Sequence, residues 1–396
     1  MDSKRTTPTL ERWRLPDGIE ELLPAEVMEI EALRRSVLDL FHGWGYETVI
    51  PPLIEYLESL LTGAGNDLDL QTFKLTDQLT GRMMGVRADM TPQVARIDAH
   101  RLNREGPTRL CYLGSVLHTR PEISGATRSP IQVGAELYGH ATIESDLEVI
   151  RLMLEMVKLA GHDSIVLDLG HVGIYRGLIE LAGVSEVDEP QLFNALQCKA
   201  STELNEIANR VVVDDAARAQ LIALNTLNGG VEVLQLAKQQ LDSRFHAEIE
   251  QLEKIVAVAE QQQWGVEFHF DLAELRGYDY HTGVLFAAYI PEQGDAVASG
   301  GRYDNVGEVF GRARPATGFS GDLKNLVTKP SEEHYPPASI FAPSTDSIEL
   351  HREIERLRKT GERVVVELAG QKEDAAAMGC DRKLVQQEGG WAAVTI

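Results

Sequence analysis

The sequence lacks the features that mark secreted, disulfide-bonded and membrane-spanning proteins. Its 396 residues include three cysteines, which are widely spaced and form no CxxC pair. This argues against a disulfide framework and against a cysteine zinc site. There is no run of about 18 apolar residues that could span a membrane, and no apolar signal segment at the N-terminus. We therefore expect a cytoplasmic protein with reduced thiols.

Clustered positive charge and several common catalytic motifs are also missing. The chain carries 38 Lys and Arg residues against 61 Asp and Glu residues, a formal net charge of −23. It contains no basic run that would release counterions from a nucleic acid. The motifs Gx4GK[ST], GxGxxG, HExxH and GxSxG are absent, and no histidine pairs with a cysteine at zinc spacing. We expect no nucleic-acid partner, no metal and no cofactor.

The apolar patterns that are present predict an α+β fold with more than one unit. Strands are expected on both sides of a mostly helical stretch at about 173–263, which we interpret as an insertion with its own small core. The core unit would cover 1–328. Residues 329–347 are rich in proline and polar residues and are expected to form a linker. Residues 348–396 alternate helix and strand and should form a small α/β unit.

A predicted β-hairpin at Leu110–Gly139 is the feature around which the other segments are arranged. Its two strands are joined by a polar, glycine-containing loop. Because side chains alternate along a strand, Gln132, Gly134 and Glu136 should share one face. A carboxamide and a carboxylate on either side of a glycine would form a polar cradle. A half-exposed sheet face with polar side chains turned to water would give the same pattern.

Three further segments could carry chemistry. Asp89 precedes a helix that Thr91 is expected to cap, and a carboxylate there could accept a ligand ammonium. Arg276, in the loop Leu275–Gly283, suits bidentate recognition of a carboxylate or phosphate. In Ser299–Asp304 two adjacent glycines would let the backbone approach a ligand closely. The structural alternatives are a simple helix cap, a surface turn with stacked tyrosines and a tight turn.

Taken in order, these segments resemble the catalytic core of class II histidyl-tRNA synthetases. Gly45–Pro52 is similar to the first class-defining motif and Val86–Thr91 to the family's LRPEGT segment. Arg276–Thr282 is similar to the RGLDYYT signature and Gly300–Asp304 to GGRYD. The resemblance covers roughly residues 15–328. It implies a mixed, mainly antiparallel sheet flanked by helices, with a helical insertion, and a dimer formed through the class II core.

The resemblance also implies a site for histidine. The positions that hold histidine in the family correspond to Asp89, Thr91, Gln132, Glu136, Arg276 and Tyr280. Glu136 and Asp89 would accept the ligand's ring N–H or its ammonium, Gln132 would hydrogen-bond the amino acid, and Arg276 would meet its carboxylate. The second tyrosine of the family's Tyr-Tyr pair is His281 here.

The nucleotide side departs from the family pattern. Three arginines that contact ATP in class II synthetases are replaced by His118, Ala126 and Asn325. Each charge-assisted contact to a polyanion is worth about 1.5–3 kcal/mol, so losing all three should abolish adenylate formation. Arg120 could replace only one of them. The C-terminal unit is too short, and too poor in clustered basic residues, for a normal anticodon-binding domain.

A synthetase fold that keeps a histidine pocket and loses ATP catalysis resembles the regulatory subunits of ATP phosphoribosyltransferase. This second resemblance implies a non-catalytic protein that binds the short catalytic subunit, supports the first step of histidine biosynthesis and allows feedback by histidine. The expected partners are that catalytic subunit, a second copy of the chain and histidine. Two alternatives stay open: an active histidyl-tRNA synthetase, and a histidine sensor that acts on another enzyme.

Overall fold

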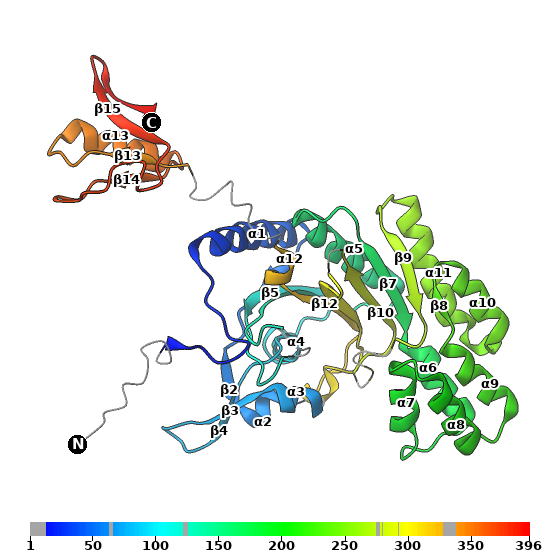
Figure 1. The fold of residues 1–396 in the computed structure, drawn as a ribbon. Coiled ribbons are helices and arrows are strands. Elements are labelled where there is room, and N and C mark those ends of the chain that lie inside the picture. The colour runs from blue at the N-terminus through cyan, green and yellow to red at the C-terminus, as the bar shows by residue number, and fades with distance from the viewer. Residues whose placement is uncertain are drawn as a thin grey trace, which may run out of the picture. The chain divides into compact units, whose positions relative to one another are not determined.

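The chain forms two compact units, which are described separately (Figure 1). The computed structural model describes residues 13–62, 66–121, 126–274, 278, 280–291, 293–327 and 338–396. The large unit comprises most of the described chain up to Val327, and the small unit is formed mainly by the residues from 338 onward. In the described ranges, no helix is both long and apolar enough to cross a bilayer.

A nine-stranded sheet forms the centre of the large unit, with the strand order β1-β5-β6-β12-β11-β10-β7-β9-β8. The pairs β1–β5 and β7–β9 are parallel and the other neighbours are antiparallel. The predicted mixed, mainly antiparallel sheet is therefore confirmed. Its strands are β1 (Glu47–Thr48), β5 (Thr108–Ser115), β6 (Ile131–Tyr138), β7 (Val166–His171), β8 (Asn228–Gly229), β9 (Glu267–Asp271), β10 (Val284–Tyr289), β11 (Ala298–Arg302) and β12 (Ala316–Asp322).

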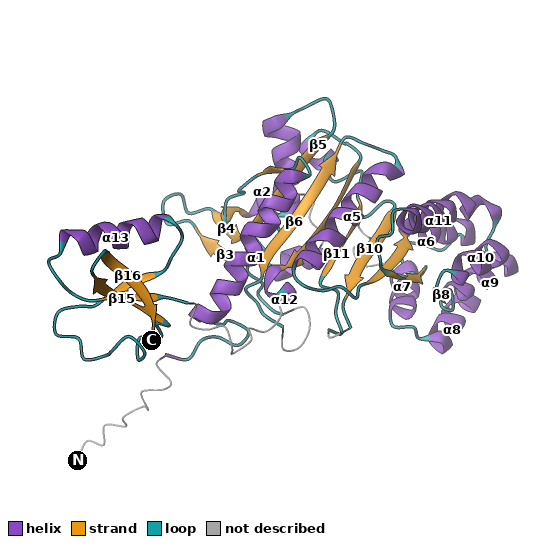
Figure 2. Ribbon diagram, turned by 90° about the horizontal axis from the view of Figure 1, so that it is seen from above, coloured by secondary structure: helices purple, strands orange, loops and turns teal. Residues whose placement is uncertain are grey.

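Two long helices, α1 (Pro24–Gly43) and α5 (Ile143–Leu159), lie across one face of this sheet (Figure 2). In α1 the buried residues recur every three or four positions, as one face of a helix requires. They join Val133, Ala135 and Leu137 of β6 in the main hydrophobic cluster. Alternation along β6 therefore turns Gln132, Gly134 and Glu136 to the opposite face, as the sequence predicted.

The opposite face holds a second cluster of buried residues. Met90 and Val94 pack there with Tyr112 of β5 and Tyr138 of β6. The segment around them begins with α4 (Thr91–Arg96) and continues as one π-helical stretch at Ile97–Leu102. This helical start, rather than the helices on the other face, brings Asp89 and Thr91 to the polar side of β6.

Helices α6–α11 fall between β7 and β9 in the chain, where a helical insertion was predicted. They are α6 (Val172–Ala182), α7 (Glu189–Gln197), α8 (Ser201–Val211), α9 (Asp215–Leu224), α10 (Glu232–Gln240) and α11 (His246–Gln261), with a 3-10 turn at Ser243–Phe245. The expectation of a separate small core was wrong. Leu178, Leu221 and Ile249 belong to the same buried cluster as the sheet, because β7 and β9 are neighbours and the helices between them pack back onto that pair.

The large unit also contains a smaller, three-stranded sheet, with the strand order β2-β4-β3. The remaining elements of the large unit are β2 (Ile54–Tyr56), α2 (Leu57–Leu60), α3 (Asn66–Gln71), β3 (Phe73–Thr76), β4 (Met83–Val86), a 3-10 turn at Glu308–Phe310 and α12 (Leu323–Leu326). Strand β4 leads into Arg87, whose buried guanidinium donates to the carbonyls of Pro51 and Ser115. The Arg87 side chain therefore joins β5 to the end of Gly45–Pro52, the segment that is similar to the first class-defining motif.

The small unit is a four-stranded sheet with the order β14-β13-β15-β16 and helix α13. Its elements are β13 (Ile340–Ala342), α13 (Ile348–Lys359), β14 (Val364–Val366), β15 (Arg382–Gln387) and β16 (Gly390–Thr395). The expectation that 329–347 is all linker was wrong from Ile340 onward, because β13 pairs with both β14 and β15. Its three residues are too few to show alternation, and Pro343 follows them directly.

Candidate functional site

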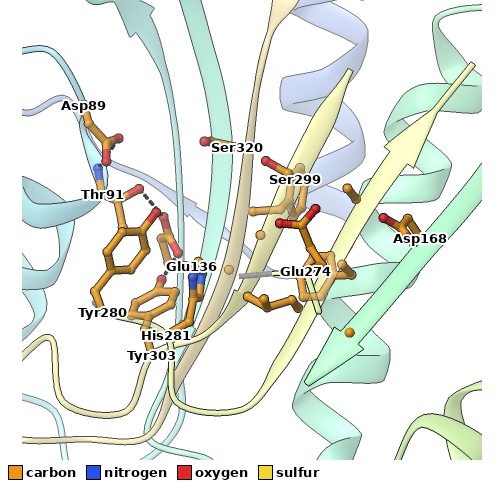
Figure 3. Close-up of a pocket in the computed structure, with 17 residues that line it drawn as sticks. Asp89, Thr91, Glu136, Asp168, Glu274, Tyr280, His281, Ser299, Tyr303 and Ser320 are labelled. Atoms are coloured by element: carbon orange, nitrogen blue, oxygen red, sulfur yellow. Dashed lines mark hydrogen bonds between the residues drawn. The ribbon is translucent and has the colours of Figure 1, made fainter. Parts of the chain in front are cut away.

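A cavity of about 140 Å³ opens in the large unit, lined by residues of β6, β7, β10, β11 and β12 and by the start of α4 (Figure 3). Asp89, Thr91, Glu136 and Tyr280, four of the six residues predicted to hold histidine, line it. A cavity of roughly 150 Å³ is large enough to hold benzene. The volume therefore suits a ligand with one small ring.

Glu136 is the centre of the hydrogen-bond network at one end of this cavity. It is only 1% exposed. Its Oε1 lies 2.9 Å from the Tyr112 hydroxyl oxygen and 3.1 Å from the Thr91 hydroxyl oxygen, both within hydrogen-bond distance, and these two hydroxyl oxygens lie 3.0 Å apart. The Tyr303 hydroxyl donates to Oε2. Three hydroxyl groups from three separate segments thus converge on one carboxyl group.

Two glycines make this convergence possible. A Cβ added at Gly318 of β12 would lie 1.6 Å from Glu136 Oε2, and one at Gly134 of β6 would lie 2.5 Å from the Tyr112 hydroxyl. Real Cβ atoms do not approach other atoms so closely. Gly134 thus leaves room for Tyr112, its direct partner on β5, and Gly318 leaves room for Glu136, its direct partner on β6.

Burial raises the pKa of Glu136 well above its usual value, and the charge of Asp89 raises it further, while the hydrogen bonds from Tyr112 and Thr91 lower it. Burial also raises the pKa of Tyr112 well above the ordinary tyrosine value. Among the described residues, no Lys or Arg lines the cavity. The described lining of the cavity therefore consists of acids, hydroxyls, apolar groups and the imidazole of His281.

Asp89 is held in place by Gln132 and by the start of α4. The Gln132 amide donates from Nε2 to Asp89 Oδ1 at 2.6 Å, and its Oε1 accepts the Met90 backbone N–H at 2.9 Å. The backbone N–H of Thr91 donates to Asp89 Oδ1 at 3.0 Å. Gln132 is not among the cavity-lining residues; in this structure it orients Asp89. Thr91 was expected to cap α4, but it is the first helical residue, which leaves its hydroxyl for Glu136.

The histidine signature segment is described only in part. Arg276, which was predicted to meet the ligand carboxylate, lies outside the described residues. Tyr280 lines the cavity and is 50% exposed. His281, which replaces the family's second tyrosine, is buried, with its ring centroid 4.4 Å from that of Tyr280 and 6.3 Å from that of Tyr303. His281 therefore lines the cavity together with the aromatic rings of Tyr280 and Tyr303.

The three positions that replace nucleotide-binding arginines do not line the cavity. His118 is buried, and its Nε2 lies 2.9 Å from the Ala88 carbonyl oxygen. Asn325 is exposed, and its backbone carbonyl accepts a hydrogen bond from the Gln293 amide at 2.7 Å. Ala126 is half-buried and offers only a methyl group. None of the three side chains can supply a permanent positive charge.

Two cations on this side, Arg128 and Lys324, contact the N-terminal segment of the chain. Arg128 donates to the carbonyls of Asp17 and His118 at 3.1 and 3.0 Å. The Lys324 ammonium donates to Glu20 at 2.8 Å, and this hydrogen bond is the main cause of the lowered pKa of Glu20. Contacts within the chain therefore engage Arg128 and Lys324, whereas Arg120 is exposed.

The opposite end of the cavity has acidic residues that the sequence analysis missed. Asp168 of β7 and Glu274 both line it, and His269 Nδ1 lies 2.7 Å from Asp168 Oδ1. Burial raises the pKa of Asp168, while its hydrogen bond with His269 lowers it. Strand β7 showed only an apolar pattern with one acid, so no local signal distinguished Asp168.

Two other roles were missed. Tyr112 could have been found, since it lies on the same face of its strand as the predicted cradle. Arg302, in the segment similar to GGRYD, turns away from the cavity and pairs with Asp146 at 2.8 Å, both side chains being buried. Arg302 therefore stabilises the junction of β11 and α5, and Tyr303 next to it reaches Glu136.

The comparisons with known proteins agree with the fold. Residues 18–326 match the family described as histidyl-tRNA synthetase. A crystal structure of an ATP phosphoribosyltransferase regulatory subunit/histidyl-tRNA synthetase from Bacillus halodurans is similar with a TM-score of 0.80 and 28% identity, covering 94% of this chain and 97% of that one. A histidyl-tRNA synthetase from Nostoc has the same fold, with a TM-score of 0.75 over 97% of both chains at 18% identity. The protein is of the class II histidyl-tRNA synthetase type.

Full-length relatives narrow this class. Residues 337–394 match the family described as ATP phosphoribosyltransferase subunit HisZ C-terminal domain. The ATP phosphoribosyltransferase regulatory subunits of Nitrosococcus oceani and Thioalkalivibrio sulfidiphilus are 54% and 56% identical over 98% and 95% of this chain, and over 98% and 96% of theirs. The chain belongs to the family of ATP phosphoribosyltransferase regulatory subunits, and the resemblance inferred from the sequence is confirmed.

Proposed function

We propose that this regulatory subunit, in the cytoplasm, binds histidine in the described cavity and transmits its presence to the catalytic subunit of ATP phosphoribosyltransferase. Membership of the family makes the chain a non-catalytic component of that enzyme in histidine biosynthesis. The observation that carries the ligand proposal is the buried Glu136 network, with its three hydroxyl contacts beside Asp89. Such a preorganised set of hydrogen-bonding groups suits a small, specific ligand.

The chemistry of the lining supports histidine. Asp89 and Glu136 at one end, and Asp168 and Glu274 at the other, are groups that accept hydrogen bonds and attract cations when ionised. Histidine offers an ammonium group and ring N–H groups as donors. Its carboxylate would need a cation, and we assign that role to Arg276 from the family resemblance. A polyphosphate, by contrast, would be repelled by those of the acidic side chains that are ionised and would find no Lys or Arg among the described lining residues.

Feedback requires that the cavity and the partner interface be energetically coupled. A regulatory coupling is typically about 1–3 kcal/mol, a change of roughly 5- to 150-fold in affinity. The coupling is reciprocal, so histidine should change the affinity of the two subunits by the factor by which the catalytic subunit changes histidine affinity. This gives the proposal a quantitative check.

We propose further that two copies of the chain associate near Gly45–Pro52, the segment that is similar to the first class-defining motif. Strand β1 is at an edge of the large sheet. Exposed apolar residues follow it in the chain: Ile50 is 88% exposed, Leu53 50% and Ile54 44%. Apolar side chains so exposed on adjacent segments are typical of an interaction surface. Sedimentation should show a dimer that Ile50→Glu dissociates; an unchanged dimer would place the interface elsewhere.

The functional test uses the short catalytic subunit with and without this chain. We expect a complex, higher activity than the catalytic subunit alone, and inhibition by histidine. Glu136→Ala and Arg276→Ala should weaken histidine binding at least tenfold, about 1.4 kcal/mol, without loss of the complex. Asn325→Ala is the matched control, because that exposed side chain does not line the cavity.

Three outcomes would overturn parts of this proposal. Unchanged histidine affinity in both cavity variants, measured by calorimetry, would remove the site assignment. Robust ATP–pyrophosphate exchange with histidine would make the chain an active synthetase. Failure to form a complex or to raise activity would point to a sensor that acts on another enzyme.

A further inference from the structure

The hydroxyl groups around Glu136 contain one hydrogen too few for the contacts they make. Glu136 Oε1, Thr91 Oγ1 and the Tyr112 oxygen form a triangle with sides of 3.1, 3.0 and 2.9 Å. Each hydroxyl carries one hydrogen, and an ionised carboxylate carries none. Two hydrogens can serve only two of the three sides, which leaves one pair of these oxygens in contact without a hydrogen bond between them.

A proton on Glu136 completes the triangle. With a carboxylic acid at this position, three hydrogens serve three sides, and each oxygen donates once and accepts once. The Tyr303 hydroxyl brings its own hydrogen to Oε2, so the second carboxyl oxygen is also satisfied. A closed ring of hydrogen bonds is favoured in a buried site, where an unmet polar contact is costly.

The charged and titratable groups around Glu136 favour the same state. Asp89 approaches from the start of α4, Tyr112 from β5, Tyr138 from the same strand and Tyr303 from the segment after β11; the facing residue on β12 is Gly318. His281 also lines the cavity, with its ring centroid 6.3 Å from that of Tyr303. None of these groups is a permanent cation. The raised pKa of Glu136 agrees with the hydrogen count.

We propose that Glu136 is a neutral carboxylic acid when no ligand is bound and that binding of a cationic ligand expels its proton. This inference rests on the proposed histidine function and adds a linkage to pH. The ligand's ammonium or ring N–H group would take over as donor to the carboxylate, the Glu136 O–H bond would break, and the proton would pass to solvent. The opposite charge of the bound ligand then stabilises the carboxylate.

The linkage has a defined sign. Where Glu136 is protonated in the empty protein and ionised in the complex, one proton leaves for each ligand bound. Affinity for histidine should then rise about tenfold for each unit of pH, until Glu136 ionises in the empty protein as well. Regulation by histidine would therefore weaken as the pH falls.

The test counts protons by calorimetry at pH 7.0 in buffers of different ionisation enthalpy, using histidine and the full chain. The wild type should release close to one proton more per bound histidine than Glu136→Gln, which has no proton to lose. The difference cancels protons that come from the ligand's own imidazole. Equal proton release in the two proteins would overturn the inference and leave histidine binding intact, whereas no binding to the wild type would overturn the proposed function.

A second measurement covers the case in which Glu136→Gln does not bind. Infrared difference spectra of the wild type should show a protonated-carboxyl C=O band that disappears when histidine is added. Tyr112→Phe removes one corner of the triangle, so its band should be weaker at the same pH. A wild-type spectrum with no such band, or with a band that persists in the complex, would contradict the proposal.

Discussion

The two halves of the synthetase-like site differ in how strongly their residues depend on one another. In the amino-acid half, Glu136 is buried and three hydroxyl groups converge on it, and two glycines leave the space they need. In the nucleotide half, Asn325 is exposed, Ala126 is half-buried and His118 is buried against the Ala88 carbonyl, and none of the three lines the cavity. The arginines of synthetase chemistry can therefore be replaced at these positions while the ligand cavity stays intact.

The largest loss of stability should come from breaking the buried Arg302–Asp146 pair, which stabilises the junction of β11 and α5. Arg302→Met leaves Asp146 as a buried, unpaired carboxyl in a site where both side chains are at least 93% buried. Breaking one partner of a buried pair typically costs about 3–5 kcal/mol. Urea unfolding should show this loss, while Arg104→Ala, which breaks an exposed pair with Glu47, should change little. Similar midpoints for both variants would contradict the assigned role.

His171, at the start of α6, should make the free energy of unfolding depend on pH. Burial lowers its pKa to about 4 from 6.5, and its Nδ1 accepts the Gly173 N–H at the start of α6. Below pH 6.5 the unfolded chain binds a proton that the folded chain refuses until about pH 4. Stability should therefore fall by about 3 kcal/mol between pH 6.5 and 4.

His171→Asn provides the control for that prediction, because asparagine can still accept the Gly173 N–H. The variant should lack this part of the pH dependence in urea unfolding measured at several pH values. If the variant and the wild type lose stability equally across the window, His171 does not titrate as described.

Gly318→Ala tests the space on which the amino-acid half depends. The added Cβ would lie 1.6 Å from Glu136 Oε2, so the network must shift; such overpacking costs about 1–3 kcal/mol. Histidine affinity should fall at least tenfold. Gly106→Ala is the matched control, since a Cβ there meets nothing within 4 Å. Normal histidine binding by Gly318→Ala would show that the network tolerates displacement.

The smallest effect on stability is expected in the nucleotide half. Ala126→Arg combined with Asn325→Arg should leave the free energy of unfolding within about 0.5 kcal/mol. Restored positive charge should raise ATP affinity at least tenfold, since even one charge-assisted contact to a phosphate is worth about 1.5–3 kcal/mol when well placed. Titration with ATP checks this. A loss of histidine binding in the same variant would contradict the independence of the two halves.

Local periodicity predicted the α+β class and the ligand-facing side of β6, whereas the mixed, mainly antiparallel sheet was implied by the resemblance to class II synthetases. Gln132 and Glu136 share a face by alternation alone, and the structure places them there. The sequence could not show that Gln132 and Glu136 have different roles, because the hydrogen bond from Gln132 to Asp89 joins residues 43 positions apart. The same limit hid the Arg302–Asp146 pair and the contact of Tyr303 with Glu136, which depend on tertiary packing.

Short elements were the other source of error. Strand β13 has three residues, too few for a period to emerge, so the prolines around it dominated the expectation of a linker. The helices α6–α11 were expected from their pattern, but their union with the main core depends on β7 and β9 pairing across the whole insertion. Neither outcome can be read from a local window.

The central claim is that the site keeps its amino-acid half and has lost its nucleotide half. Its most direct test is calorimetric titration of the isolated chain, first with histidine and then with ATP. The account predicts saturable histidine binding and no heat from ATP binding, with or without histidine present. Saturable ATP binding, or the absence of histidine binding in a folded sample, would contradict it.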